Sequence, residues 1–255
     1  MTLNELDKYF RAFLKIEDYP SDPSRNGIQI QNSQPNSKQI TKIAFAVDAC
    51  EQSALEAAHA GAQLLFVHHG LFWGGCDPIV GHTYHRYSAF LSNDLALYAC
   101  HIPLDANFPY GNNYGLAERL KLKDIQSFGI WKGMSTGVKG RLKKPLSIEE
   151  LVQNVLLPDE KPNAVFPFGK NQIETVGIIS GGGGEDYIQA VDAGLDAFIT
   201  GEVEHQLFHY IKENKINVIA AGHYQTETVG VNLIKQKVEK ELGLETIFID
   251  IPTGL

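Results

Sequence analysis

Strand-like and helix-like segments alternate along this chain, and they do so in two rounds. In each round, short apolar runs are followed by segments with apolar residues at helical spacing. The expected strands cover residues 42–48, 63–69 and 95–101 in the first round and 174–180, 196–202 and 216–223 in the second. Alternation of this kind is typical of a mostly parallel sheet with helices on both faces. The sequence therefore predicts an α/β fold.

The two rounds can be aligned with each other. Residues 58–69 match residues 190–202 around a shared Ala-Gly, and residues 93–105 match residues 214–227 with a gap of one residue. The alignment sets His68-His69 opposite Gly201-Glu202, His101 opposite His223, and Asp105 opposite Glu227. It predicts an internal duplication with two similar α/β domains, residues 1–124 and 125–255, each a mostly parallel or mixed sheet flanked by helices.

The segment between the two rounds has a different residue pattern. Residues 124–145 read DIQSFGIWKGMSTGVKGRLKKP, which favours strands, and a helix is expected directly after them. Ser147 and Glu150 have the spacing of a capping box at the start of that helix. Thr2 and Glu5 have the same spacing at the N-terminus, which predicts a first helix there.

Composition limits the partners and the compartment. The net charge of −8 at pH 7 gives no general attraction for phosphate backbones, and the nearest basic segment is residues 139–144, so no nucleic-acid partner is expected. No window approaches the length of a membrane-spanning helix, so no membrane association is expected. Cys50, Cys76 and Cys100 fit neither a disulfide framework nor a CxxC zinc motif, which favours reduced thiols and a cytoplasmic location.

The expected strand at residues 63–69 ends in a pair of histidines, His68 and His69. A buried strand tolerates imidazoles poorly unless their nitrogens are satisfied. Because neighbouring side chains of a strand alternate between its two faces, the strand must end at this pair, and Gly70 would give the chain freedom to turn. A hydrogen-bonded turn, a catalytic dyad and a metal site all remain open for the pair taken alone.

More polar residues follow the other expected strands. Asp105 lies in the loop after one strand, His223 ends another, and Glu227 falls in the first turn of the next helix. Ligands of parallel sheets bind beyond the carboxyl ends of the strands, so these groups and the histidine pair are expected to converge. Three histidines and two carboxylates suit zinc, iron or manganese, and two ions about 3.5–4 Å apart suit them better than one four-coordinate ion.

Six motifs occur in order along the chain. They are NGIQIQ at 26–31, VHHGLFW at 67–73, HIPLDA with GNN at 101–113, ISGGGG at 179–184, ITGEV at 199–203 and GHYQTE at 222–227. From residue 26 to the C-terminus, the chain resembles the dinuclear-metal proteins of the GTP cyclohydrolase I type 2 homologue family, which are interacting-factor-three-like proteins. The resemblance implies two similar α/β domains and a ring-shaped homohexamer. It also implies a metal pair held by His68, His69, Asp105, His223 and Glu227.

The chain departs from the family pattern at two positions. Bacterial relatives often have a histidine where this chain has Asn107 and another where it has Tyr224. These are not ligand positions, so the departures concern only the surroundings of the metals. No segment between the halves is long enough to be the extra domain that some members insert.

Two more residues are candidates for a catalytic role. His101 is the repeat partner of His223, so it is expected to point to the same region, either as an anchor for a ligand or as a general acid. Glu202 stands where the first half has a metal ligand, and a carboxylate near two cations would be held ionised. A purely structural role is the alternative for both residues.

Several other features have two explanations each. Gly181–Gly184 joins a strand to a helix, which suits either a close-packed turn or a contact with a substrate phosphate. Phe72 and Trp73 are expected to pack the loop that carries the histidines, or to wall a substrate pocket. His82 and His85 have the spacing of an exposed helix face.

The expected function is that of a metal-dependent hydrolase. Two metal ions would lower the pKa of a bound water toward neutrality and stabilise developing negative charge. The resemblance implies that this water attacks the imidazole ring carbon of GTP, opens the ring and releases formate. The alternatives are hydrolysis of another nucleotide or a phosphoester, and a non-enzymatic metal-binding or protein-interaction ring.

Overall fold

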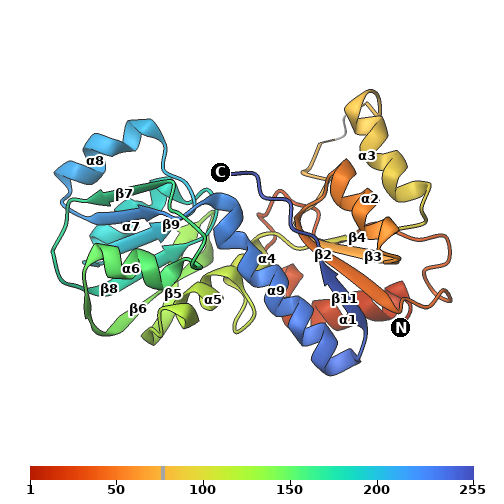
Figure 1. Ribbon diagram of the computed structural model, residues 1–255, viewed down its shortest axis with the longest axis horizontal. Helices are drawn as coiled ribbons and strands as arrows, with labels where there is room; N and C mark the ends of the chain where they lie inside the picture. Colours follow the sequence, from red (N-terminus) through yellow and green to blue (C-terminus); the bar gives the residue numbers. More distant parts are fainter. Residues whose placement is uncertain (76–77) are drawn as a thin grey trace. The chain divides into compact units, whose positions relative to one another are not determined.

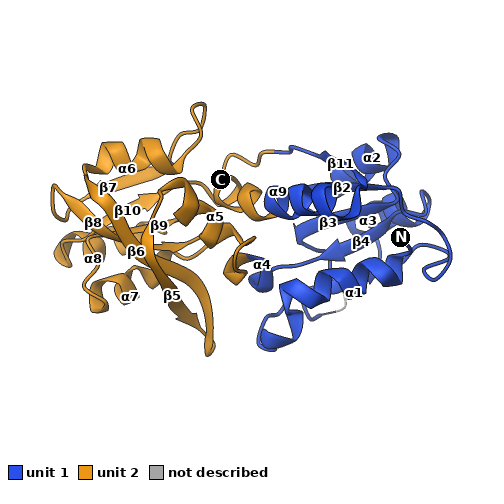
Figure 2. Ribbon diagram, turned by 90° about the horizontal axis from the view of Figure 1, so that it is seen from below, with its two compact units in different colours: residues 1–104, 231–251 blue, residues 105–230, 252–255 orange. Residues whose placement is uncertain are grey.

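The computed structural model describes residues 1–75 and 78–255, so Cys76 lies outside the described residues. The internal contacts divide the chain into two compact units, which Figure 2 colours separately. Unit 1 comprises residues 1–104 and 231–251, and unit 2 comprises residues 105–230 and 252–255. Two helices, α4 (Ile102–Ala106) and α9 (His223–Leu242), have residues in both units.

Unit 1 is built on a five-stranded sheet in the order β1-β4-β3-β2-β11 (Figure 1). The strands β4, β3, β2 and β11 are parallel, and β1 pairs antiparallel with β4. The strands are β1 (Gly27–Ile30), β2 (Lys42–Asp48), β3 (Leu64–His69), β4 (Ala96–Ala99) and β11 (Glu245–Phe248). The helices wholly within unit 1 are α1 (Leu3–Leu14), the 3₁₀ turn η1 (Ile16–Asp18), α2 (Glu51–His59) and α3 (His82–Leu91).

Different helices cover the two faces of this sheet. Phe10 of α1 packs against Phe66 of β3 and Tyr98 of β4, with ring centroids 5.0 and 4.9 Å apart. On the opposite face, α2 and α3 join Leu65 and Val67 of β3 in one apolar cluster. Because both faces are buried, the strands of unit 1 consist of almost continuous apolar runs.

Unit 2 is built on a six-stranded mixed sheet in the order β5-β6-β8-β9-β10-β7. The strands are β5 (Lys123–Trp131), β6 (Met134–Leu146), β7 (Ala164–Pro167), β8 (Ile173–Ile179), β9 (Ala197–Thr200) and β10 (Asn217–Ala220). The helices are α5 (Asn112–Arg119), α6 (Ile148–Val155), α7 (Tyr187–Asp192) and α8 (Phe208–Glu213), with 3₁₀ turns η2 (Gly184–Asp186) and η3 (His205–Leu207). Figure 2 shows α7 and α8 on one face of the sheet and α6 on the other.

The two sheets contain the same four-stranded arrangement. In unit 1 the antiparallel strand β1 precedes the parallel strands β2, β3 and β4, in the spatial order β1-β4-β3-β2. In unit 2 the antiparallel strand β7 precedes β8, β9 and β10, in the order β7-β10-β9-β8. This repeat confirms the predicted fold class and its internal duplication. It makes β3 equivalent to β9 and β4 equivalent to β10.

The division into compact units falls elsewhere than residues 124 and 125. Helix α5 packs on β6 and β8, so unit 2 already begins at Asp105. Near the C-terminus, β11 returns to unit 1 and pairs in parallel with β2. The alternating pattern alone cannot show to which sheet a terminal helix or strand is added. The boundary at residue 124 stays a prediction about the repeat.

Helices α1 and α6 begin at the capping residues that the sequence predicted. The hydroxyl of Thr2 accepts a hydrogen bond from the backbone N of Glu5, whose side chain accepts from the backbone N of Thr2. Ser147 and Glu150 make the same reciprocal pair at the start of α6. None of the described helices combines the length and the apolar character needed to cross a bilayer.

Candidate metal centre

The two histidines at the end of β3 lie side by side. His68 is fully buried, the side chain of His69 is 20% exposed, and their ring centroids are 4.5 Å apart. The strand ends at His69, as predicted. Gly70 does not have the positive φ that a freely turning glycine would use. Instead, a Cβ there would lie 2.6 Å from the Cβ of Ala99 and 2.4 Å from the side-chain amide of Gln29, so close packing requires this glycine.

Both imidazoles are held through Nδ1. Nδ1 of His68 lies 3.0 Å from the carbonyl oxygen of Cys100. Because a carbonyl can only accept, Nδ1 carries the proton and donates it. Nδ1 of His69 bonds to Oδ1 of Asp48 at 2.8 Å, and Asp48 is its partner across β2 and β3. A ring anchored in this way presents Nε2 outward, which is the usual arrangement of metal-ligating histidines.

His101 is held in the same way by Asp22. The Asp22 side chain has no exposed surface, and it accepts hydrogen bonds from Nδ1 of His101 at 2.9 Å, the backbone N of Ser24 at 2.9 Å, Nδ2 of Asn26 at 2.8 Å and the backbone N of Ile102 at 3.1 Å. Burial alone would raise the pKa of Asp22, but the hydrogen bond and charge of His101, with the other donors, hold it below its ordinary value. Asp22 is thus an ionised carboxylate that fixes the ring.

The three imidazoles form one cluster within unit 1. His68, His69 and His101 each offer a ring nitrogen, and these nitrogens lie within 4.8 Å of one another. The ring of Trp73 borders the cluster, with its centroid 4.9 Å from that of His101 and 5.9 Å from that of His69. Oriented imidazole nitrogens this close together suit a divalent ion such as zinc or iron. The donor set of unit 1 therefore fits a metal.

In unit 2, Asp105 is 7% exposed and lies in the short helix α4, where the sequence predicted a loop. Its Oδ1 accepts from Nδ2 of Asn112 at 2.9 Å and from the hydroxyl of Ser180 at 2.8 Å. Asn113 donates to the backbone oxygen of Asp105 at 3.3 Å and accepts from the backbone N of Ser180 at 2.7 Å. This network fixes the direction of the carboxylate.

His223 and Glu227 lie one turn apart at the start of α9. Because β10 ends at Ala220 and α9 begins at His223, the prediction that His223 ends the strand was wrong, and Glu227 is in the second turn. Nε2 of His223 lies 3.1 Å from Oε1 of Glu227, and its Nδ1 is hydrogen-bonded to Glu202. Burial lowers the pKa of His223, but the two carboxylates outweigh it and raise this pKa to about 9. A metal ion at Nε2 would replace the proton held there.

Gly181 packs directly against this pair. It has a φ of +65°, and a Cβ there would lie 2.2 Å from Oε1 of Glu227 and 3.1 Å from Nε2 of His223. Its backbone N donates to the hydroxyl of Thr226 at 3.0 Å, and its carbonyl accepts from the backbone N of Glu202 at 3.0 Å. Close packing explains this first glycine of Gly181–Gly184. A contact between the loop and a substrate stays a prediction.

Within each unit the predicted residues are brought together. Unit 1 groups His68, His69 and His101. Unit 2 joins His223 to Glu202 and Glu227. Asp105 belongs to the same group in unit 2, because its partner Ser180 directly precedes Gly181, which packs on Glu227.

The residues that hold these side chains were not predicted from the sequence. They are Asp22, Asp48, Asn112, Asn113 and Ser180. A signal existed for four of them: Asn112, Asn113 and Ser180 stand inside quoted motifs, and Asp48 ends the expected strand at residues 42–48. Asp22 precedes the first motif by four residues, and no pattern singles it out.

Comparisons with known proteins agree with this fold. The sequence profile of the family described as Duf34/NIF3 (NGG1p interacting factor 3) matches residues 1–254. A Treponema pallidum (strain Nichols) protein named GTP cyclohydrolase 1 type 2 homolog is 43% identical, with 100% of both chains covered. A protein of the same name from Deinococcus radiodurans is 42% identical over 99% of this chain and 94% of its own. The crystal structure of a Thermus thermophilus protein has a TM-score of 0.88 and 38% identity, with 100% of both chains covered. The chain thus belongs to the Duf34/NIF3 family.

Proposed function

We propose that this protein is a metal-dependent hydrolase in which two divalent ions are held by His68, His69, Asp105, His223 and Glu227. The observation that carries the proposal is that hydrogen bonds from neighbouring groups fix the directions of the proposed ligand side chains. Nδ1 of each histidine has an acceptor, and Oδ1 of Asp105 has two donors. A histidine that merely caps a turn needs no such anchoring, whereas a metal ligand does.

The course of the chain supports this ligand set, because His101 directly precedes α4, and α4 contains Asp105. Only three residues therefore separate the imidazole cluster of unit 1 from the first donor of unit 2. The repeat supports it as well, since Asp105 follows β4, and His223 and Glu227 follow the equivalent strand β10.

His101 and Glu202 have separate roles beside the proposed ligands. When bound, two divalent ions would supply Lewis-acid activation of water near neutral pH. His101, with Nδ1 bonded to Asp22, has Nε2 available to give a proton to a leaving group or to take one from the attacking water. Glu202 bonds to Nδ1 of His223, so its role is to orient a ligand and not to touch the substrate.

GTP is the first candidate substrate. The curated relatives are named GTP cyclohydrolase 1 type 2 homologs, and such a reaction would hydrolyse the imidazole ring of guanine and release formate. A family name alone does not establish a substrate, so another nucleotide or a phosphoester is the second candidate. The description of the family as an interacting factor favours one non-enzymatic alternative, a metal-binding ring that engages a protein partner.

We also propose that the protein works in the cytoplasm as a homohexamer. The location rests on the cysteines, which fit neither a disulfide framework nor a zinc motif. The assembly rests on the family resemblance, and closed rings of identical subunits are a common form of assembly. Light scattering at micromolar concentration is expected to give the mass of six chains. A monomer at that concentration would contradict the proposal.

Metal content and turnover test the central proposal together. After reconstitution with excess zinc, manganese and iron, elemental analysis is expected to find about two ions per chain, as in two-metal hydrolytic sites. His223→Ala should lower this content. At most one ion per chain would contradict a dinuclear site. Full metal content without turnover of any nucleotide, phosphoester or amide would favour the binding ring.

A further inference from the structure

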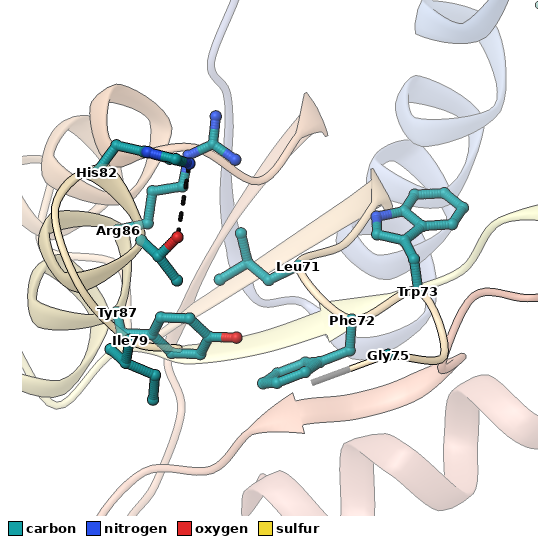
Figure 3. A pocket seen from close by; sticks show the side chains of 9 residues that line it. Leu71, Phe72, Trp73, Gly75, Ile79, His82, Arg86 and Tyr87 are labelled. Carbon is teal, nitrogen blue, oxygen red and sulfur yellow. Dashed lines mark hydrogen bonds between the residues drawn. The ribbon is translucent and has the colours of Figure 1, made fainter. Parts of the chain in front are cut away.

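A pocket of about 490 Å³ lies next to the imidazole cluster, within unit 1 (Figure 3). One wall comes from the loop after β3, with Leu71, Phe72 and Trp73, and the other comes from α3 and the residue Ile79 before it. Among the described residues, His82, Arg86 and Tyr87 of α3 line the pocket. This volume lies in the range of pockets that hold small molecules.

The loop wall is held in place before any ligand binds. Oε1 of Gln29 accepts from the backbone N of Leu71 at 2.7 Å and from that of Phe72 at 3.2 Å. The backbone N of Arg25 donates to the carbonyl oxygen of Phe72 at 2.9 Å. The ring of Phe72 meets that of Tyr87 edge to face across the pocket, with centroids 5.6 Å apart. The aromatic surface is therefore a fixed feature of the unit, which reduces the ordering cost of binding.

Opposite the aromatic loop wall, Arg86 gives the pocket a positive charge. In Figure 3, Arg86 and His82 extend side by side from α3, one helical turn apart. Among the described residues, no carboxylate lines the pocket, and α3 contains neither Asp nor Glu. A guanidinium presents several N–H donors in a fork that suits phosphate or carboxylate oxygens. The polar end of the pocket is thus suited to an anion in a chain whose net charge is −8.

Trp73 connects the pocket to the imidazoles. Its ring lines the pocket and also lies edge-on against His101, with centroids 4.9 Å apart. Its Nε1 donates to the carbonyl oxygen of Gly70 at 2.9 Å, which fixes the indole in this position. A planar group that packs on Trp73 would therefore lie at the histidine end of the pocket, while Arg86 stands at the far wall in Figure 3.

We propose that this pocket binds a ligand that joins a planar heteroaromatic ring to an anionic group, with the ring on Trp73 and the anion on Arg86. Nucleoside monophosphates have this chemistry on a compact frame. That the ligand is also the substrate rests on the proposed hydrolase function, because its ring end would face His69 and His101. The binding itself does not depend on metal or turnover.

Calorimetry on metal-free protein separates the two proposals. The probes are adenosine and guanosine 5′-monophosphates, the corresponding nucleosides, and inorganic phosphate. Wild type is expected to bind the nucleotides at least tenfold more tightly than either the nucleosides or phosphate alone. Arg86→Ala should lower nucleotide affinity at least tenfold and leave nucleoside affinity unchanged. Arg86→Lys should restore part of the loss, because the charge returns without the fork.

Arg141→Ala is the matched control, since Arg141 is an exposed arginine that bonds Glu174 and does not line the pocket. It should leave every affinity unchanged. Equal nucleotide binding by wild type and Arg86→Ala would overturn the assignment, and so would phosphate binding as tightly as the nucleotides. Absence of nucleotide binding to the metal-free wild type would also overturn the pocket proposal. Metal content and turnover of the reconstituted protein would then decide the hydrolase proposal separately.

Discussion

The two units hold their donors by different means. In unit 1 each of the three imidazoles has its own anchor: the carbonyl oxygen of Cys100 for His68, Asp48 for His69 and Asp22 for His101. In unit 2 the donors contact one another: His223 bonds to Glu227 and to Glu202. There, Gly181 leaves no space beside the pair.

This difference follows from the chemistry of the donors. One hydrogen bond at Nδ1 is enough to fix the direction of an imidazole, so unit 1 needs only one acceptor for each ring. Carboxylates close to one another also need a positive charge between them. In the metal-free protein, the raised pKa of His223, about 9, supplies that charge. Unit 1 should therefore be sensitive to the loss of an anchor, and unit 2 to any change of space or charge.

The largest effect is expected from Gly181→Ala in unit 2. A Cβ at this position would overlap Oε1 of Glu227 at 2.2 Å, and the φ of +65° adds the cost of a left-handed residue. We expect a loss of about 3 kcal/mol in unfolding free energy, from about 1–2 kcal/mol for the backbone and about 1–3 kcal/mol for the overlap. Urea unfolding and elemental analysis measure the effect, and metal content should fall with stability.

Gly194→Ala is the matched control for this prediction. Gly194 has nearly the same φ, +67°, but a Cβ there would meet no atom within 4 Å. Only the backbone cost of about 1–2 kcal/mol should appear. Equal losses in the two variants would show that the donors of unit 2 do not depend on the space at Gly181.

Next in size is Asp22→Asn in unit 1. The amide nitrogen would face donors that now bond to the carboxylate, including Nδ1 of His101, and we expect a loss of about 1–2 kcal/mol at pH 7. Because the pKa of Asp22 is lowered in the folded protein, its stabilisation is present above the unfolded pKa of about 3.9. It disappears as the pH falls through the lower folded pKa.

The two proteins should therefore approach equal stability in acid, which unfolding curves between neutral and acid pH would reveal. Asp18→Asn, at an exposed position, should match wild type throughout. A difference between wild type and Asp22→Asn that stays constant down to acid pH would argue against an ionised anchor.

Asp105→Asn tests the charge of unit 2 while keeping the shape of the side chain. We expect weaker metal retention and at least a tenfold loss of rate on any accepted substrate, about 1.4 kcal/mol of transition-state stabilisation. Asp192→Asn, an exposed position in the same unit, is the control. Full activity of Asp105→Asn with both metals absent would place the chemistry elsewhere.

The smallest effect is expected from Cys100→Ala in unit 1. The backbone oxygen of Cys100 holds His68, and alanine keeps that oxygen. Metal content measured by elemental analysis should therefore equal that of wild type. Loss of an ion would show that the thiol takes part in the site.

Much of the fold was predictable because it depends on local patterns. The segment KIAFAVD became β2 with its predicted bounds, and the capping residues Thr2 and Ser147 begin α1 and α6. Placement in a sheet was harder, because β11 pairs with β2 across roughly two hundred residues of sequence. Neither short-range periodicity nor a cap contains that information.

In the candidate site, too, local patterns were predictable from the sequence and long-range contacts were not. His68 and His69 could be found because an apolar run ends in them, and Asp105, His223 and Glu227 because they follow strands. Asp22 could not be found, since it lies 79 residues from His101 and meets it only through the fold. Sequence thus reveals donors at strand ends, whereas their anchors emerge from long-range contacts.

Trp73 makes the imidazole cluster visible to spectroscopy. Indole emission responds to nearby imidazolium, to metals that quench it and to rings that stack on it, and this indole lies against His69 and His101. The other tryptophan, Trp131, lies in unit 2 with the ammonium of Lys132 4.2 Å above its ring, so it reports on different surroundings. With Trp131→Phe, the chain would contain a single indole. Its emission would follow the filling of the site in real time, without any added label.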